Sequence, residues 1–401
     1  MMSHTAMFVP RSGDGWVDPH PMYEALRDHD PLHHVDDPTG RDHDHWVLSR
    51  FEDVWRAARD HGTFSSEQGL TTTYGERERI GLDEARPMVM MDPPDHTAFR
   101  RLVARGFTPR QVATVEPAIR AFVTDRLDAV AEAGACDIVA ALFKPLPSMV
   151  VAHYLGVPDA DRERFDVWTE AIVDANALGD VTLAATRLSE LLDYFSELIE
   201  RRRAAPGDDM ISELVAAGDD VSVLAVLGFA FTMVAGGNDT TTGLLGGAAE
   251  LLTAHPDQRR LLLDDPGLLP GAVEELLRLT SPVQGLARTT TTPVTLHGRT
   301  VPAGRKVLLL YGSANRDPRE FGDEADRLDV TRRIERMMTF GYGVHHCLGA
   351  AAARLQARIA LELLLERFPA FEVDADAGTF APGNYVRRRT SLPFRPVGSD
   401  A

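Results

Sequence analysis

The chain has 401 residues, of which 44% are apolar, and its 60 Asp and Glu residues outnumber its 42 Lys and Arg residues, which gives a formal charge of −18. This charge repels phosphate backbones and anionic lipid headgroups, so we expect neither nucleic acid nor a membrane as a partner. Only two cysteines are present, Cys136 and Cys347. They make no disulfide framework, which is typical of a reducing compartment where a special cysteine is a ligand or a nucleophile.

We expect one continuous domain over 1–401, because no internal repeat, low-complexity segment or concentrated linker divides the chain. The first residues lack the basic and apolar regions of a signal peptide. The longest apolar stretch, 223–235, is shorter than the ~20 residues that cross a membrane. We therefore expect a cytoplasmic protein in which 223–235 is part of a buried core helix.

Helices dominate the predicted secondary structure. They are indicated by prolines in first turns, by apolar residues at steps of three and four, and by Ala-rich stretches without a helix breaker. The helices expected are 110–132, 181–203, 270–279 and 348–368. The short strands expected are 46–49, 294–301 with His297 and Gly298 as a turn, 306–311 and the chain near 385–393. The sequence therefore predicts a mainly α fold with small β-sheets.

Three short segments that we expect to be helical contain residue patterns with a possible function. His96 and Arg100, at i and i+4 after two prolines, project from one helix face and could clamp an anion. In 235–241, adjacent glycines weaken an apolar helix by roughly 1 kcal/mol each relative to alanine, a cost that some contact should offset. Glu275 and Arg278 lie on one face at i and i+3. Taken singly, the first pattern is also typical of a solvated helix face, the second of a helix end, and the third of a surface ion pair.

The most informative segment is 340–349, Phe-Gly-Tyr-Gly-Val-His-His-Cys-Leu-Gly, which directly precedes a predicted helix. Unpaired N–H groups and the positive dipole at a helix start stabilise a thiolate at Cys347, which favours a metal-bound sulfur. The residues alone leave two other interpretations open: a small buried cysteine in a tight loop, and a zinc site that includes His345 and His346. A zinc site usually needs a second ligand cluster, which no other cysteine supplies.

The pattern Phe340-Gly-x-Gly-x-His-x-Cys347-x-Gly349 resembles the haem-binding loop of the cytochrome P450 family of haem-thiolate monooxygenases. The resemblance covers about 18–396 and includes the other motifs in the expected order. It implies the cytochrome P450 fold, with haem b between a long distal helix near 222–253 and the cysteine loop. Cys347 would be the proximal iron ligand, whose electron donation favours O–O cleavage.

The resemblance also implies roles for residues outside the iron ligand. Asp239 and Thr240 would be an acid–alcohol pair that delivers protons during oxygen activation. The family's Glu-Arg-Arg ion-pair network would consist of Glu275, Arg278 and Arg327, the last of which precedes Leu where the family usually has Phe. The residues expected to contact haem or its propionates are His96, Arg100, Arg288, Phe340, Gly341, His345 and Gly349.

Two further surfaces follow from the resemblance. The family forms its substrate pocket from segments that correspond to 68–91, 160–205, 283–286 and the chain near 385. The pocket residues expected here are Met90, Val234, Ala235, Gly236, Val283 and Leu286. The positive charges expected to face an acidic redox partner on the cysteine side are Arg101, Arg105, Arg110, Arg354 and Arg358.

The resemblance implies an enzyme that inserts one atom of O2 into a small, largely apolar organic substrate. Electrons would come from NAD(P)H through a separate ferredoxin or flavodoxin and its reductase, and we expect no fused reductase domain. Three alternatives stay open. They are an H2O2-using peroxygenase on the same fold, against which Asp239 and Thr240 argue, a haem-binding sensor or carrier without turnover, and a zinc- or cysteine-dependent hydrolase. The sequence leaves the identity of the substrate undetermined.

Overall fold

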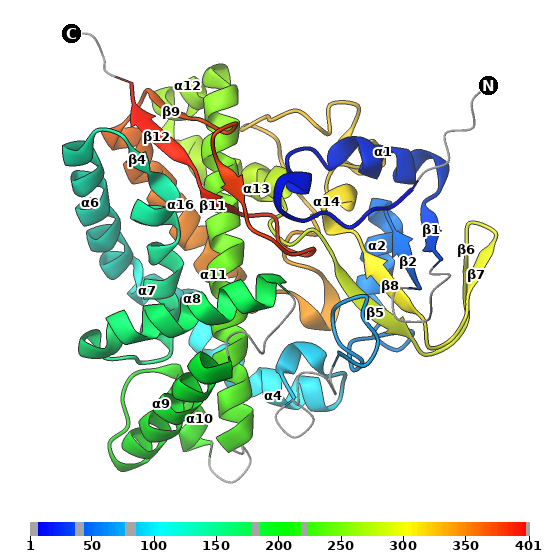
Figure 1. The fold of residues 1–401 in the computed structure, drawn as a ribbon, viewed down its shortest axis with the longest axis horizontal. Helices are drawn as coiled ribbons and strands as arrows, with labels where there is room; N and C mark the ends of the chain where they lie inside the picture. Colours follow the sequence, from blue (N-terminus) through cyan, green and yellow to red (C-terminus); the bar gives the residue numbers. More distant parts are fainter. Residues whose placement is uncertain (1–6, 37–43, 77–85, 179–184, 218–222, 398–401) are drawn as a thin grey trace.

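The computed structural model describes the chain except for residues 1–6, 37–43, 77–85, 179–184, 218–222 and 398–401. Helices fill one side of the molecule, and the largest sheet lies on the other side with the N-terminal helix (Figure 1). The predicted mainly α architecture with small sheets is confirmed. The helices are α1 (His20–His29), α2 (Phe51–Arg59), α4 (Asp95–Val103), α5 (Pro109–Thr114), α6 (Glu116–Ala133), α7 (Pro145–Tyr154), α8 (Arg162–Leu178), α9 (Ala185–Ala204), α10 (Met210–Ala216), α11 (Val223–Ala254), α12 (Pro256–Asp264), α13 (Leu269–Thr280), α14 (Tyr311–Ala314), α15 (Pro318–Phe321) and α16 (Ala350–Arg367).

The predicted helices agree with the structure except in one place. α13 and α16 match 270–279 and 348–368 to within two residues at each end. The predicted helix 110–132 is instead two helices, α5 and α6. Pro117 lies in the first turn of α6, where a missing backbone N–H costs nothing, whereas in a helix interior it would break the hydrogen-bond ladder. Of the predicted helix 181–203, residues 181–184 lie outside the described residues.

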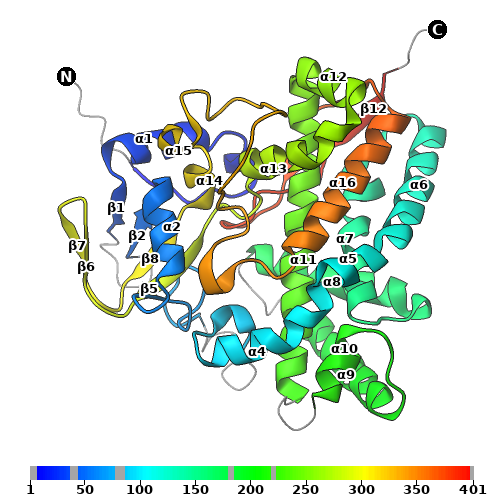
Figure 2. The ribbon, with the colours of Figure 1, turned by 180° about the vertical axis from the view of Figure 1, so that it is seen from behind.

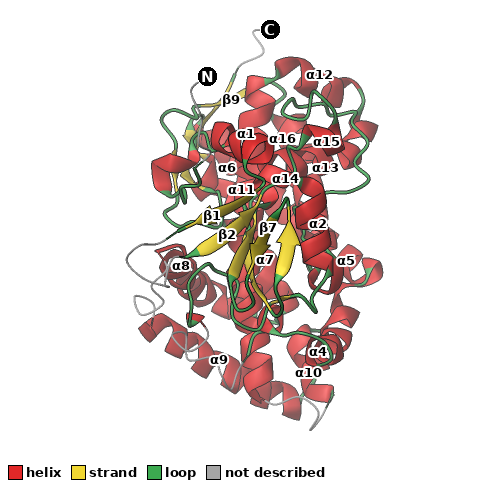
Figure 3. Ribbon diagram, turned by 90° about the vertical axis from the view of Figure 1, so that its right-hand side faces the viewer, coloured by secondary structure: helices red, strands yellow, loops and turns green. Residues whose placement is uncertain are grey.

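The largest sheet has five strands in the order β1-β2-β8-β5-β3 (Figure 3). β2 and β8 pair in parallel, and the other neighbours pair antiparallel. The predicted strand 294–301 is a hairpin whose turn residues His297 and Gly298 both have positive φ, at 52° and 73°, as a two-residue hairpin turn requires. The strands are β1 (Leu32–Val35), β2 (His45–Leu48), β3 (Phe64–Ser65), β4 (Cys136–Asp137), β5 (Leu286–Thr290), β6 (Val294–Leu296), β7 (Arg299–Val301), β8 (Lys306–Leu309), β9 (Phe371–Val373), β10 (Thr379–Phe380), β11 (Arg389–Ser391) and β12 (Pro393–Pro396).

Helix α11 is the centre of the main hydrophobic core. It contacts α7, α8, α13 and α16, the last of which runs beside it in the view from behind (Figure 2). α11 is long and apolar enough to cross a membrane by length and composition. Most of its residues from 238 to 249 are buried inside the protein, which is typical of a helix that is apolar on all sides and lies in a core.

Close packing explains two of the glycines in α11, Gly237 and Gly247, but not Gly236, where a Cβ atom would meet nothing within 4 Å. A Cβ atom on Gly237 would lie 2.7 Å from Val151 of α7, and one on Gly247 would lie 2.7 Å from Thr280 of α13. Any larger residue at these positions would force the neighbouring helices apart, because protein cores are packed without spare volume. The glycines therefore bring α7 and α13 close to the long helix.

Candidate haem site

The cysteine loop is held in shape by positive-φ glycines and by helix α2. Gly341 and Gly343 have φ values of 63° and 73°, a conformation that glycine adopts without steric cost. A Cβ atom on Gly343 would lie 2.9 Å from the carbonyl oxygen of Ala58 in α2, so glycine is also required for this close approach. Tyr342 stacks on Trp55 of α2 with ring centroids 3.6 Å apart. The loop is therefore a rigid platform that precedes α16.

Cys347 lies three residues before α16, and its backbone N–H donates to the carbonyl of Phe340 at 2.8 Å, which closes the loop. The side chain is accessible to solvent although it lies deep among protein atoms. Burial raises the pKa of the thiol, and the backbone N–H of Gly349 and the charges of Arg100 and Arg354 oppose this rise. These opposing groups are the kind that stabilise a thiolate, because they place positive charge near the sulfur.

Two histidines with buried ring nitrogens lie against each other beside this loop. The rings of His96 in α4 and His345 have centroids 4.3 Å apart. Both ring nitrogens of His96 and Nε2 of His345 are buried and accept or donate no hydrogen bond. Burial, with the charges of Arg288, His96 and Arg100, lowers the pKa of His345 to about 2, and burial and Arg100 lower the pKa of His96. The pair is therefore neutral, with unmet hydrogen-bonding capacity.

Two arginines complete the cluster of basic groups. Arg288 in β5 is buried, and its Nη1 donates to the carbonyl of Ala287 at 2.8 Å. Arg100 donates to the carbonyl oxygens of Val344 at 3.0 Å and His346 at 2.6 Å, so it also fixes the cysteine loop. Buried polar atoms normally find a partner, so three orphaned nitrogens gathered beside two arginines fit an anionic group bound between them. Paired carboxylates such as haem propionates fit these donors.

The donor set also bears on the metal. Among the described residues, no group of three or more His, Cys, Asp or Glu side chains could hold a metal ion. A zinc site would need three or four such ligands, so the zinc interpretation finds no support. Iron in a porphyrin needs few protein ligands because the macrocycle supplies four nitrogens, and a single cysteine thiolate fits it. The residues present therefore fit haem.

Asp239 and Thr240 lie in α11, which remains helical throughout this segment. The Thr240 hydroxyl donates to the carbonyl of Gly236 at 2.9 Å, a back-bond that is typical of threonine in helices. Asp239 is buried, and its Oδ1 lies 2.5 Å from Nε of Arg388, which is also buried. Sequence reasoning missed Arg388 as a partner, although the run 387–389 is one of only two stretches of three consecutive arginines in this acidic chain.

The ion-pair network is present, but one predicted member is wrong. Glu275 and Arg278 are fully buried and form a bidentate pair with both distances at 2.7 Å. Arg327 does not contact them; it is exposed and pairs with Glu324 at 3.1 Å. Arg332 takes the third place, with Nε 3.2 Å from Glu275 Oε1. The prediction matched Arg327 to the family by the local motif alone, and the chain here is an irregular loop, in which a short motif does not fix which side chain turns inward.

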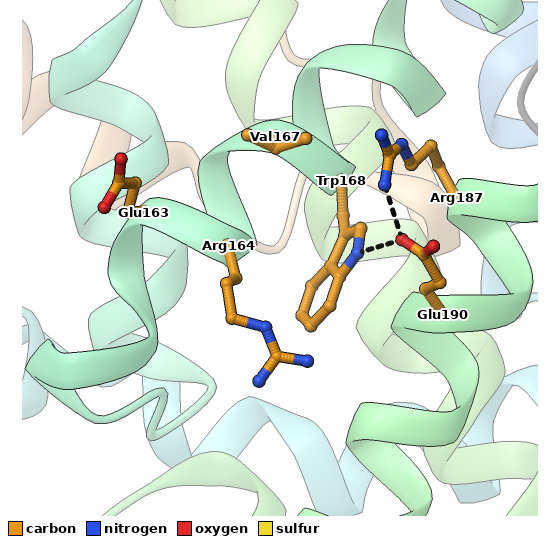
Figure 4. Close-up of a pocket in the computed structure, with 6 residues that line it drawn as sticks. All are labelled: Glu163, Arg164, Val167, Trp168, Arg187 and Glu190. Atoms are coloured by element: carbon orange, nitrogen blue, oxygen red, sulfur yellow. Dashed lines mark hydrogen bonds and ion pairs between the residues drawn. The ribbon is translucent and has the colours of Figure 1, made fainter.

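The predicted pocket residues differ in burial. Met90 and Val234 are buried, whereas Ala235, Val283 and Leu286 are partly exposed and Gly236 is exposed. Val283 pairs with Val386 in an isolated β-bridge, which brings two predicted pocket segments together. A pocket of about 510 Å³ lies between α8 and α9, within the predicted pocket segment 160–205 but lined by none of the six predicted pocket residues; in it Glu190 accepts from Trp168 and Arg187 (Figure 4). It is lined by Glu163, Arg164, Val167, Trp168, Arg187 and Glu190, none of which is a predicted haem contact.

The arginines predicted to face a redox partner differ in whether an acidic side chain pairs with them. Arg354 pairs with Glu274 at 2.6 Å, and Arg358 pairs with Glu116 at 3.1 Å and with Glu362 at 3.2 Å. Acidic neighbours therefore neutralise these two, contrary to the prediction that they present free positive charge. Of the five predicted arginines, Arg101, Arg105 and Arg110 are exposed and make no ion pair with a described residue.

The fold and the site define a haem-thiolate protein, and comparison with known proteins identifies its family. The cytochrome P450 family model matches residues 248–378. Cytochrome P450 130 of Mycobacterium tuberculosis is 60% identical over 98% of both chains. Vitamin D(3) 25-hydroxylase of Pseudonocardia autotrophica is 37% identical over 95% of this chain and 94% of that protein. The solved structure of the Bacillus subtilis bacillaene polyketide synthase cytochrome P450 PksS has a TM-score of 0.88 at 32% identity and covers 98% of this chain and 100% of that one.

The chain belongs to the cytochrome P450 family and has its fold. It is therefore a monooxygenase that binds haem iron through a cysteine thiolate, as the members of this family do. The zinc- or cysteine-dependent hydrolase is excluded.

Proposed function

We propose that this enzyme inserts one oxygen atom from O2 into a small, largely apolar organic substrate. The proposed electron source is NAD(P)H, through a separate ferredoxin or flavodoxin and its reductase, in the cytoplasm, with 1–401 working as one haem domain. The observation that carries this proposal is the accessible thiol of Cys347 beside a cluster of buried, unpartnered histidine nitrogens. When bound, haem supplies the redox chemistry of oxygen activation.

In this proposal Cys347 binds the iron, and the loop keeps its sulfur in place. The backbone N–H of Gly349 and the charges of Arg100 and Arg354 stabilise the thiolate. His96, His345 and Arg288 hold the propionates, whose negative charge satisfies the orphaned nitrogens. Phe340 and Gly341 shape the loop, and the ring of Phe340 lies 4.5 Å from the guanidinium carbon of Arg354.

Asp239 and Thr240 deliver protons in the same proposal. The Thr240 hydroxyl is held by the Gly236 carbonyl, so its oxygen lone pairs can accept a further hydrogen bond. The buried Asp239 carboxylate supplies a group that can lose and regain a proton nearby in the same helix. A peroxygenase draws its oxygen from H2O2 and has less need of such delivery, so the pair favours a monooxygenase.

The lining of the proposed pocket indicates the class of substrate. Met90, Val234, Ala235, Val283 and Leu286 are all apolar, and such walls bind organic molecules mainly by excluding water. The name of the Pseudonocardia relative states that it hydroxylates vitamin D(3), a hydrophobic molecule, which agrees with this class. The exposed Gly236 adds no bulk, and a Cβ atom there would meet nothing within 4 Å.

The proposal is tested by spectra of the purified protein and of Cys347→His. The parent protein should show a ferrous-CO band near 450 nm, the band that the cytochrome P450 name records, and substrate-dependent NAD(P)H oxidation with a ferredoxin and its reductase. Cys347→His should keep haem and lose that band. Turnover supported only by H2O2 would favour the peroxygenase, and haem without any turnover would favour a sensor or carrier. A variant that keeps the band would refute the assignment of Cys347.

A further inference from the structure

Three consecutive arginines, 387–389, tie the C-terminal part of the chain to elements that are distant in sequence. Arg387 Nε donates to the carbonyl of Trp16 at 2.8 Å. Arg389 Nε lies 2.7 Å from Glu250 Oε1 in α11. Arg388 lies between them and pairs with Asp239, also in α11. The arginines therefore hold an extended segment across the long helix.

Asp239 and Glu250 are eleven residues apart, which is three helical turns, so both carboxylates lie on the same face of α11. Gly243 lies between them on that face. A Cβ atom there would be 2.7 Å from the carbonyl oxygen of Arg387 and 3.4 Å from Cβ of Arg388. The missing side chain of Gly243 therefore lets the backbone of this segment contact the helix directly, which puts the Arg388 guanidinium beside Asp239.

The ion pair of Arg388 with Asp239 is built into the protein interior. The side chains are 5% and 8% exposed, and the atoms are 2.5 Å apart. A buried carboxylate needs a partner because transfer out of water disfavours its charge. Removing one partner of such a pair strands the other charge, so the pair fixes the ionisation and the conformation of Asp239 together.

The same segment reaches the proposed pocket. Val386 pairs with Val283, and the backbone carbonyl of Tyr385 accepts from the backbone N–H of Gln284 at 2.7 Å. The Tyr385 hydroxyl lies 2.9 Å from the backbone nitrogen of Thr72, which donates to it. Displacement of Tyr385 or Val386 would therefore shift Arg388, which lies only three or two residues further along the chain.

We propose that Arg388 is a positioning residue that holds Asp239 as an anion in one orientation for proton delivery, and that the segment 385–389 links this ion pair to the walls of the pocket. The inference rests on the proposed function, in which the Asp239 carboxylate accepts a proton and passes it on, so that its anionic form is the state each delivery restores. Arg388 comes from the C-terminal segment and acts through Asp239.

The test compares Arg388→Gln and Arg388→Lys with the matched control Arg389→Gln, which breaks the neighbouring pair to the same helix without touching Asp239. The infrared spectrum of the Asp239→Asn variant is subtracted from that of the parent protein, and the difference contains the carboxylate band of Asp239. Arg388→Gln should shift this band, Arg388→Lys should restore part of its position, and Arg389→Gln should leave it unchanged. This readout needs no turnover, so it stays informative if the proposed function fails.

The second readout is NADPH oxidation with a plant-type ferredoxin and its reductase in H2O and D2O. Because a small misplacement of a catalytic group is costly, Arg388→Gln should slow turnover about tenfold and raise the solvent isotope effect. Combining it with Asp239→Asn should add no further loss of turnover rate.

If Arg388→Gln does not fold, Arg388→Lys is compared with Arg389→Lys in the same two measurements. The proposal would be overturned if Arg388→Gln left both the carboxylate band and the isotope effect as in the parent. It would also be overturned if the losses of turnover rate multiplied in the double variant. Absence of turnover in the parent, with the band shifted as expected, would count against the proposed function alone.

Discussion

Two buried polar regions of this protein differ in how many of their polar groups have a hydrogen-bond or ion-pair partner. Around Glu275 and Arg278, both side chains are fully buried and every charge has partners, including carbonyl oxygens of Asn315 and Ala325 at 2.7 and 2.6 Å. Beside the cysteine loop, His96 is equally buried, yet neither ring nitrogen has a partner. The complete network stabilises the fold by itself, whereas the nitrogens beside the cysteine loop have capacity left for a bound anion.

The largest expected effect is in the satisfied region. Glu275→Gln keeps the shape of the side chain but leaves Arg278 buried with an unpaired charge, which should lower the free energy of unfolding by about 3–5 kcal/mol. Urea unfolding measures this loss. Glu324→Gln, which breaks only an exposed pair with Arg327, should cost less than about 0.5 kcal/mol. Equal losses in the two variants would show that the buried network contributes no more to the free energy of unfolding than an exposed ion pair.

Arg332 and Arg327 test the corrected membership of that network. Arg332 contacts Glu275 and donates to the carbonyl oxygens of Phe321 and Glu324, both at 2.9 Å. Arg332→Gln should therefore cost about 2–3 kcal/mol of stability, because several hydrogen bonds to a charged group are lost. Arg327→Gln should stay within about 0.5 kcal/mol of the parent protein. A larger loss for Arg327 would restore the prediction from sequence.

The unsatisfied region should respond in the opposite way. His96→Phe removes two buried atoms without partners, so the haem-free protein should be no less stable than the parent. Haem affinity should fall about tenfold, because one hydrogen bond to a propionate is lost. Haem titration and urea unfolding of the haem-free protein give the two values. His297→Asn, which changes a surface pair with Asp53, is the control and should leave haem affinity unchanged. Haem-free protein that unfolds more easily would assign His96 to the fold.

The smallest effect is expected on the surface, where paired and unpaired arginines also differ. Arg105 and Arg110 are exposed and form no ion pair with a described residue, so an acidic ferredoxin can meet their charge directly. Reversing both to Glu should slow reduction several-fold at low salt and less at high salt. The control reverses Arg260 in α12 and Arg395 in β12 and changes the net charge equally. Arg105 follows α4 and Arg110 lies in α5, and both of these helices lie below α12 and β12 in Figure 2. Equal slowing in both double variants would leave only the effect of net charge.

Local patterns in the sequence predicted the helices and the cysteine loop. A proline in the first turn placed α13, and an Ala-rich stretch without a helix breaker placed α16, each to within two residues, because both signals act within a few residues of the chain. The motif that ends at Gly349 identified the family because its glycines are needed locally for backbone conformation and close approach. The same local view could also place Glu275 beside Arg278, since both belong to one helix turn.

Only the tertiary structure decided which residues meet from separate segments. Arg332 replaces Arg327 because an irregular loop turns the later arginine inward. Arg354 loses its free charge to Glu274, which lies 80 residues earlier in the chain. Arg388 finds Asp239 because Gly243 admits the backbone of a distant segment to the face of α11. Such pairs depend on how whole elements pack and on the course of the loops between them, and neither is encoded in the spacing of neighbouring residues.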